Sequence, residues 1–244
     1  MITSVPVSYS VEWIKASIKV AERNYSLCLA CGLLVMLINM FVSFIPFLGS
    51  IASTVLIFLF YTAQLKFVRR LLNKEEVNFE QFLQTIFDPE IFSKNSPYIV
   101  ICAISAALAS FLVIIDSAAT SYYYRQGGIL MSLGSVWNVL NFLLATLCAF
   151  AVDLRDKNPE LSWQAGLRRA FAGVWQNIIP WVLTGLLVSL FAIVSMVLCV
   201  LPFFLYFVPM TFPYVYLIYA SIFEGLNIEQ VADDWRKPVS TLNS

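Results

Sequence analysis

Two long stretches of this chain contain no charged residue. Residues 24–65 form one run of 42 uncharged residues, and residues 170–223 form a second run of 54. A helix that crosses the hydrocarbon core of a bilayer needs about 20 apolar residues. Each run is therefore long enough for two membrane-spanning helices joined by a short turn.

Proline marks the expected turn inside each run. Pro46 lies in an I-P-F-L-G segment of the first run, and Pro202 lies in an L-P-F-F segment of the second. Helices tend to end at or before the residue that precedes a proline. Two more apolar stretches lie between the runs. The sequence thus predicts an all-α polytopic membrane protein, a single integral membrane domain over residues 1–244 with six spans at about 26–45, 47–66, 97–117, 129–152, 178–200 and 203–223.

The composition agrees with a bilayer as the main solvent. Hydrophobic residues make up 60% of the chain and charged residues 12%, against roughly 45–50% and 25% in soluble domains. The chain has no histidine, which excludes histidine as a general base or metal ligand. Acidic and basic residues balance at 15 each, so we expect no nucleic-acid partner.

The basic residues predict the orientation in the membrane. Of the 15 Lys and Arg residues, 14 fall before span one, between spans two and three, between spans four and five, or after span six; Arg125 is the exception. Cytoplasmic loops carry an excess of Lys and Arg. We therefore expect a multi-pass protein of the bacterial inner membrane with both termini in the cytoplasm. A re-entrant hairpin at each proline turn is the alternative to full crossing.

A sequence pattern recurs along the chain. Asn24 and the Gly-Leu-Leu-Val segment that begins at Gly32 recur 153 residues later as Asn177 and the same segment at Gly185, and a weaker copy starts at Asn95. An amphipathic segment precedes each copy. These observations predict three repeats, each made of a cytoplasmic interfacial helix and a transmembrane hairpin.

The three amphipathic segments point to contact with lipid headgroups. Their apolar positions are Val11, Ile14, Ile18, Ala21 and Tyr25 in the first, Phe79, Phe82, Leu83, Ile86 and Phe87 in the second, and Trp163, Leu167, Ala170, Phe171 and Val174 in the third. Asn78 is the expected N-cap of the second. Such helices immerse an apolar face in the bilayer surface while basic residues attract anionic lipid. The expected anionic-lipid contacts are Lys15, Lys19, Arg23, Arg168 and Arg169. The alternative is that these faces pack on the protein's own cytoplasmic ends.

The order of these elements resembles a group of uncharacterised bacterial inner-membrane proteins. An amphipathic helix is followed by a hairpin with I-P-F-L-G at its apex, a basic exit at residues 66–70 and a second amphipathic helix. The chain is also similar to the membrane domain attached to some glycerophosphodiester phosphodiesterases. The resemblance covers most of the chain in outline and rests on Pro46, Gly49 and the repeat. It implies the fold but no activity, because the catalytic domain of those enzymes is a separate soluble domain.

A few polar or helix-breaking residues lie within the predicted spans. The candidates for ligand lining or helix packing are Asn39, Asp116, Asn138, Asn141, Pro209 and Pro213. Asp116 fits a cation or proton site, or an outer-interface pair with Arg125. Asparagine amides form hydrogen bonds between membrane helices, whereas prolines that break a span can release carbonyl groups for a ligand.

The sequence contains no recognisable catalytic, cofactor-binding or metal-binding motif. Asp153, Asp156 and Glu160 alternate with basic residues, and we expect them in a solvated loop. These features favour a non-enzymatic accessory or scaffold protein that engages lipid, a membrane partner or a second copy of the chain, with no cofactor. The alternative is a small permease or channel for a small solute or lipid.

Overall fold

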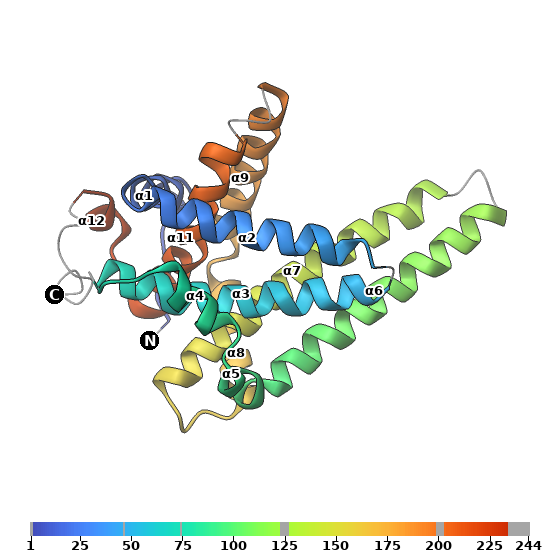
Figure 1. The fold of residues 1–244 in the computed structure, drawn as a ribbon, viewed down its shortest axis with the longest axis horizontal. Coiled ribbons are helices and arrows are strands. Elements are labelled where there is room, and N and C mark those ends of the chain that lie inside the picture. Colours follow the sequence, from blue (N-terminus) through green and yellow to red (C-terminus); the bar gives the residue numbers. More distant parts are fainter. Residues whose placement is uncertain (1, 46, 74, 123–126, 199–202, 234–244) are drawn as a thin grey trace.

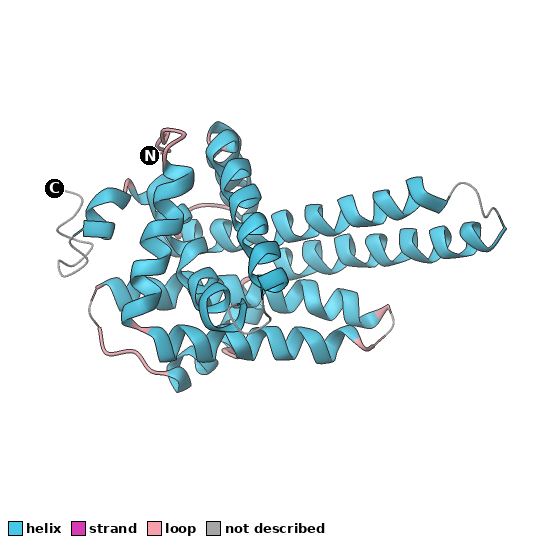
Figure 2. Ribbon diagram, turned by 90° about the horizontal axis from the view of Figure 1, so that it is seen from above, coloured by secondary structure: helices cyan, strands magenta, loops and turns pink. Residues whose placement is uncertain are grey.

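The computed structural model describes residues 2–45, 47–73, 75–122, 127–198 and 203–233, and gives only the backbone at 43, 116–122, 127–136, 138–139, 196, 198 and 232–233. All regular elements in this part of the chain are helices, which confirms the predicted all-α class (Figure 2). They are α1 (Tyr9–Arg23), α2 (Tyr25–Ser43), α3 (Leu48–Leu72), α4 (Phe79–Ile86), α5 (Pro89–Lys94), α6 (Ser96–Tyr122), α7 (Gly127–Lys157), α8 (Trp163–Gln176), α9 (Ile178–Leu198), the π-helical η1 (Phe203–Phe207), α11 (Val208–Tyr219), the π-helical η2 (Ala220–Glu224) and α12 (Ile228–Asp233).

Five helical segments are long and apolar enough to cross a membrane. They cover Tyr25–Val42, Leu48–Leu72, Ser96–Ile115, Ile178–Ser195 and Phe203–Glu224, and coincide with five of the six predicted spans. The remaining predicted span, 129–152, lies within α7, which is 31 residues long. Many side chains of α7 lie outside the described residues, so the count of six spans stays a prediction.

The long helices form hairpins that start from one end of the molecule. The α2–α3 hairpin and the longer α6–α7 hairpin point the same way from this common end, whereas the α9–η1 hairpin leaves at a steep angle (Figure 1). The shorter helices α1, α4, α5, α8 and α12 gather at the common end (Figure 1). Helix α3 contacts α2, α4, α6, α7 and α11, and is therefore the central helix.

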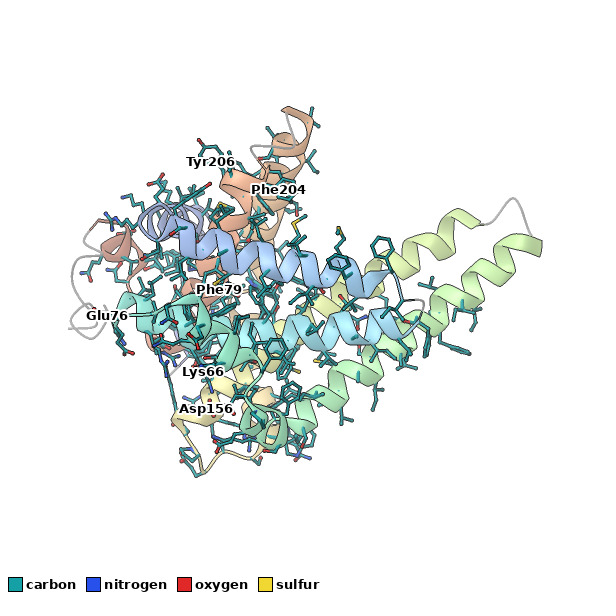
Figure 3. All side chains as sticks on the ribbon, viewed as in Figure 1. Lys66, Glu76, Phe79, Asp156, Phe204 and Tyr206 are labelled. Atoms are coloured by element: carbon teal, nitrogen blue, oxygen red, sulfur yellow. The ribbon has the colours of Figure 1, made fainter. Side chains whose placement is uncertain are left out.

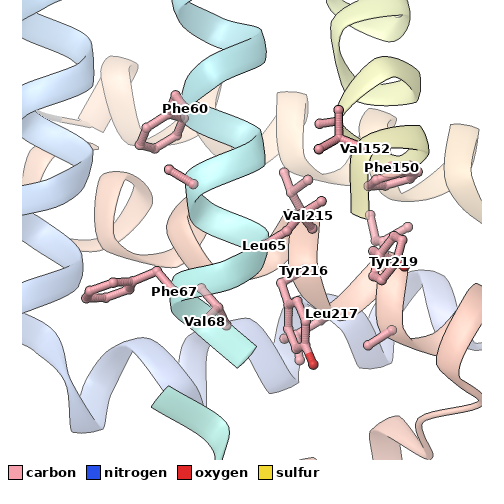
Figure 4. Close-up of a cluster of buried hydrophobic side chains, with 14 of the residues drawn as sticks. Phe60, Leu65, Phe67, Val68, Phe150, Val152, Val215, Tyr216, Leu217 and Tyr219 are labelled. Carbon is pink, nitrogen blue, oxygen red and sulfur yellow. The ribbon is translucent and has the colours of Figure 1, made fainter. Parts of the chain in front are cut away.

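Aromatic packing fastens the short helix α4 to the membrane helices. Phe82 of α4 is fully buried against Phe60 and Phe67 of α3 and Phe212 of α11, with ring centroids 5.2–5.8 Å from it. Phe60 and Phe67 lie on α3 within the larger buried cluster (Figure 4). Edge-to-face pairs of this kind stabilise a core beyond the burial of their area. The apolar face of α4 thus packs on the protein itself.

The ends of α4 follow local sequence rules. Asn78 is the N-cap, as predicted: its side chain accepts a hydrogen bond from the Gln81 amide, and the Gln81 side chain accepts one from the Asn78 amide. This reciprocal capping box satisfies two amide groups at the start of the helix. Pro89 then occupies the first turn of α5, and the Asp88 side chain caps that helix.

Three asparagines hold the same place in the chain. Asn24, Asn95 and Asn177 each lie between a short helix at the common end and a long helix that leaves it. Their backbone angles are similar, with φ of −118°, −107° and −115° and ψ of 37°, 13° and 27°. These are the positions that the repeat pattern aligned.

The sixth predicted span is one continuous helix from Phe203 to Glu224, and the release of carbonyl groups at its prolines stays a prediction. Pro209 and Pro213 both lie inside α11, and η1 and η2 extend it on both sides. A wider π-helical turn lets a helix continue where the normal hydrogen-bond pattern is interrupted. Gln64 of α3 supports this region, because its Nε2 donates to the Thr211 carbonyl at 3.2 Å.

The first residues are tied to the last part of the fold. The Thr3 amide donates to the Ile222 carbonyl at 2.8 Å, and the Val5 amide donates to Asn177 Oδ1 at 2.8 Å. Asn177 in turn donates to the Thr3 carbonyl at 3.0 Å. Trp13 of α1 is fully buried, and its Nε1 donates to Ser221 Oγ at 2.9 Å.

Gly32 and Gly185, which the repeat pattern pairs, have different surroundings, and this generates a prediction. A Cβ at Gly32 would lie 2.6 Å from Val208 Cγ1 and 3.2 Å from the Val208 carbonyl oxygen, whereas a Cβ at Gly185 would meet nothing within 4 Å. We expect Gly32→Ala to lower the free energy of unfolding by about 1–3 kcal/mol through overpacking. Gly185→Ala should leave it unchanged or raise it. Unfolding of both variants in detergent micelles measures the difference; equal stabilities would contradict the close approach of α2 and α11.

Candidate functional site

A partly polar cavity lies between α3, α6 and α7. Its volume is about 540 Å³. Five uncharged polar residues line it, together with apolar ones such as Phe47 at the α2–α3 turn. The polar lining residues are Ser50, Ser53, Thr54, Ser110 and Asn141.

Most polar groups of this cavity already have protein partners. Ser53 Oγ donates to Asn39 Oδ1 of α2 at 2.7 Å, and Thr54 and Ser110 donate to carbonyls of their own helices. Ser105 of α6 donates to Asn141 Oδ1 of α7. The Asn141 Nδ2 and the Ser50 hydroxyl have no hydrogen-bond partner among the described residues, so they are available as donors to a ligand.

A second cavity, of about 460 Å³, is almost entirely apolar. It lies between α2, α3, α7, α9, η1 and α11, and aromatic rings make up much of its wall. The rings are Phe60, Tyr61, Phe142, Phe150, Trp181, Phe203, Phe207, Phe212 and Tyr214. This volume is within the range of about 300–1,000 Å³ that ligand sites occupy. Apolar cavities do not hold ordered water well, so hydrocarbon is the natural filling of a cavity at this depth.

Two of the six residues singled out in the sequence line these two cavities, but not the same one. Asn39 lines the apolar cavity and Asn141 lines the polar one. Both also join neighbouring helices, through Ser53 and Ser105. The side chains of Asp116 in α6 and Asn138 in α7 lie outside the described residues, so their expected roles stay untested.

The two prolines lie apart from the two cavities. Pro209 and Pro213 are both buried in α11. Pro209 lines a small space of about 110 Å³ beside α1, with Ile18 and Tyr25 among the residues across it. Pro213 lines none of the cavities described above.

A buried ionic cluster joins three helices at the common end. Arg69 Nη2 of α3 lies 2.6 Å from Asp153 Oδ2 of α7 and 2.8 Å from Glu224 Oε1 of η2. Lys157 pairs with Glu224 as well. Tyr216 donates to Glu224 Oε2 at 3.1 Å, and its ring lies 5.6 Å from the Arg69 guanidinium carbon. The two positive and two negative side chains balance one another.

The expectation of a solvated loop at residues 153–160 is wrong for its first members. Helix α7 continues to Lys157, and the Asp153 side chain is only 2% exposed. The i,i+4 spacing of Asp153 and Lys157 is the sequence signal for this continuation, because such pairs share one helix face. The burial of Asp153 depends on Arg69, which is 84 residues away.

A second, more exposed ionic group lies nearby. Asp156 Oδ2 is 2.7 Å from Lys66 Nζ of α3, and its Oδ1 is 2.9 Å from Lys94 Nζ of α5. Figure 3 labels Lys66 and Asp156 at this end of the molecule. Burial raises the pKa of Asp156, but hydrogen bonds and charge attraction from Lys66 and Lys94 outweigh burial and lower the pKa below its usual value.

Helix α8 has one buried face and one exposed aromatic face. Gly166, Ala170, Gly173 and Val174 are buried against the protein. Trp163, Leu167, Phe171 and Trp175, which we call the α8 stripe, follow one another at intervals of four residues. Phe171 and Trp175 are 54% and 66% exposed, and their rings stack at 5.9 Å. A groove of about 520 Å³ between α7 and α8 includes Trp163, Arg168 and Phe171 in its lining.

Two cations beside this stripe have no partner among the residues that the structure describes. Arg168 and Arg169 make no hydrogen bond, ion pair or ring contact within the described part of the chain. Each of the other Lys and Arg side chains described has such a contact or another electrostatic interaction.

Helix α1 also has one face toward the protein and one exposed face. Trp13, Ala16 and Val20 face the protein, while Val11 and Ile18 are exposed.

Comparisons of the chain with family models, with curated proteins and with solved structures find no match. Among the described residues, no group of three or more histidine, cysteine or acidic side chains is placed to hold a metal ion.

The ionic cluster generates a prediction about stability. Asp153→Asn leaves part of the buried Arg69 charge uncompensated, and we expect a loss of roughly 3 kcal/mol, the low end of the range for breaking a buried pair. The double variant Arg69→Met, Asp153→Leu should recover much of this loss, because both charges go together. Unfolding in detergent micelles is the measurement, with the exposed Glu160→Gln as control. A loss for the double variant larger than that for Asp153→Asn would contradict the argument.

The pKa of Asp156 generates a prediction about acid stability. Because the folded-state pKa lies below the unfolded value of about 3.9, the carboxylate contributes stability above that value and loses it as pH falls through the folded pKa. We expect Asp156→Asn to cost roughly 0.5–1 kcal/mol at about pH 7, since Lys94 is largely exposed. The difference between variant and parent should shrink as the pH falls below about 3.9 and should disappear below the folded-state pKa. A constant difference across this range would show that charge is not the cause.

Proposed function

We propose that this chain is a non-enzymatic accessory or scaffold protein of the bacterial inner membrane that engages anionic lipid through α8. The observation that carries the proposal is that Arg168 and Arg169, which have no partner among the described residues, lie beside the exposed rings of Phe171 and Trp175. Guanidinium groups without protein partners are suited to phosphate oxygens, which they bind through paired hydrogen bonds.

The surroundings of α8 support a position at the bilayer surface. Trp163 and Trp175 have the amphipathic rings that are enriched at the level of lipid headgroups. The α8 stripe continues onto α9, where Ile179, Val182 and Leu186 are at least half exposed. An exposed apolar surface that runs from a short helix onto a span is typical of an interfacial helix with its apolar face in lipid.

Of the five basic residues expected to meet anionic lipid, the α8 pair fits best. Lys15 already pairs with Glu12 at 2.8 Å, and Lys19 and Arg23 have interactions of their own. Helix α1 also presents its buried face, which includes Trp13, to the protein. The proposed lipid contact therefore centres on Arg168 and Arg169.

The proposal includes six spans in three repeats, with the common end in the cytoplasm. The three junctions at Asn24, Asn95 and Asn177, with their similar backbone angles, support the repeats. The ion pairs of Arg69 with Asp153 and Glu224 support a shared side for the ends of spans two, four and six. A membrane partner or a second copy would meet the exposed face of α6, which includes Ile104, Leu108 and Phe111.

A permease or channel for a small solute or lipid is the second candidate. The polar cavity between α3, α6 and α7 is the observation that favours it. Transport would require that this cavity open to both sides of the bilayer in turn. Flux into liposomes that Asn141→Leu abolishes, while Arg168→Gln with Arg169→Gln leaves it intact, would favour this candidate over the accessory role.

The lipid contact of α8 is tested by measuring which lipids stay bound to the protein. The full chain is placed in nanodiscs of phosphatidylethanolamine and phosphatidylglycerol, and bound lipid is counted by native mass spectrometry. We expect Arg168→Gln with Arg169→Gln to lower the enrichment of phosphatidylglycerol by about 30-fold, because each of the two basic residues contributes about 1 kcal/mol of attraction to an anionic surface.

The matched control removes two cations that have protein partners. Lys15 pairs with Glu12 and Arg70 with Glu75, so Lys15→Gln with Arg70→Gln changes the net charge by the same amount. The control should keep most of the enrichment. An equal loss in both double variants would reduce the effect to net charge, and no loss in the α8 variant would refute the proposal.

A further inference from the structure

The polar and apolar cavities adjoin one another inside the bundle. Ile57 of α3 and Phe142 of α7 line both of them. The polar cavity reaches Phe47 and Ser50 at the α2–α3 turn, whereas the apolar cavity reaches Phe150 and Ile218, toward the common end. Polarity therefore changes along the bundle axis, with the polar part farther from the common end.

None of the described residues that line either cavity is charged. Among these residues, the lining donors without a protein partner are the Asn141 Nδ2 and the Ser50 hydroxyl, and Asn141 as a whole is 5% exposed. A donor in a largely apolar surrounding is stabilised by an acceptor. Because the described lining offers no cation to compensate a phosphate or a free carboxylate, the fitting acceptor is neutral. The carbonyl oxygen of an ester meets this requirement.

The apolar cavity lies at a depth that hydrocarbon can reach from the bilayer. Its walls come from segments long and apolar enough to span a membrane, including α2, α3 and α9. The α9–η1 hairpin diverges from α2 and α3 (Figure 1), and residues of both sides line the cavity, among them Met36 and Val188. A chain from the surrounding lipid fits this space in size and in chemistry.

We infer that the two cavities form one binding site for a diacyl glycerolipid. The glycerol and its ester groups occupy the polar cavity, where Asn141 and Ser50 donate to ester carbonyls. One acyl chain passes Ile57 and Phe142 into the apolar cavity. This site goes beyond the lipid contact of α8: it lies inside the bundle, uses none of the α8 residues, and takes lipid from the leaflet at the α2–α3 turn.

The site is tested on the full chain in the same nanodiscs. The protein is transferred to detergent, and the lipid that remains bound to it is measured. We expect Asn141→Leu to reduce this lipid about fivefold to tenfold, the effect of one or two lost hydrogen bonds. Ser105→Ala is the matched control, because it removes the protein partner of Asn141 but leaves the amide donors. Equal losses in both variants would mean that Asn141 acts only in helix packing, and would overturn the inference.

The position of the acyl chain in the apolar cavity is tested by placing a larger side chain in the cavity wall. Val188 lines the cavity, and Val182 lies on the exposed side of the same helix. Val188→Phe should abolish lipid retention, while Val182→Phe should not change it. Retention that survives Val188→Phe would overturn the inference.

A cross-linking measurement gives a readout that does not depend on stability. Phosphatidylethanolamine with a diazirine at the end of one acyl chain should label peptides that contain Phe150 or Ile218. Labelling confined to outward residues such as Leu186 and Ile193, or a bound mass equal to a free fatty acid, would overturn the inference. The phosphatidylglycerol preference assigned to α8 should be the same in Val188→Phe and in the parent, so the two proposals fail separately.

Discussion

The contact of Arg69 with Asp153 and Glu224 sets the arrangement on which the other features depend. It holds the end of α3 against the ends of α7 and η2, and α3 is the central helix of the bundle. A charge pair with little exposure to solvent tolerates small movements of its helices poorly. Any increase in the distance between the two charges leaves a desolvated charge without compensation. The contact therefore fixes the positions of these three helix ends relative to one another. Two of these helices, α3 and α7, line both cavities, so the positions of the shared walls follow from this contact.

The long helices could be predicted from the sequence because a single physical requirement decides them. A charged residue is costly in hydrocarbon, so the uncharged runs delimit the spans. The predicted span 26–45 corresponds to α2, Tyr25–Ser43, and 178–200 corresponds to α9, Ile178–Leu198. The N-cap at Asn78 could be predicted from the sequence as well, because a capping box depends on residues only three positions apart. Whether six spans form three repeats still depends on the side chains of α7 that lie outside the described residues.

Other features depended on contacts that a linear sequence does not reveal. The acidic residues of 153–160 looked like a solvated loop until Arg69, far away in the chain, provided a buried partner for Asp153. Pro209 and Pro213 looked like a break, but π-helical turns extend the helix on both sides of α11. Asn39 and Asn141 were recognisable as polar residues within spans. The sequence left open whether they pack helices or line a ligand site; in the structure each joins neighbouring helices and also lines a cavity.

The ties at the start of the chain have a consequence for how the protein is made. Thr3 and Val5 are hydrogen bonded to Ile222 and Asn177, and Trp13 is bonded to Ser221. During synthesis these partners leave the ribosome only after most of the other helices. Until then the indole of Trp13 stays uncovered. Helix α1 is therefore made well before the neighbours on which it packs, and its docking coincides with the completion of η2.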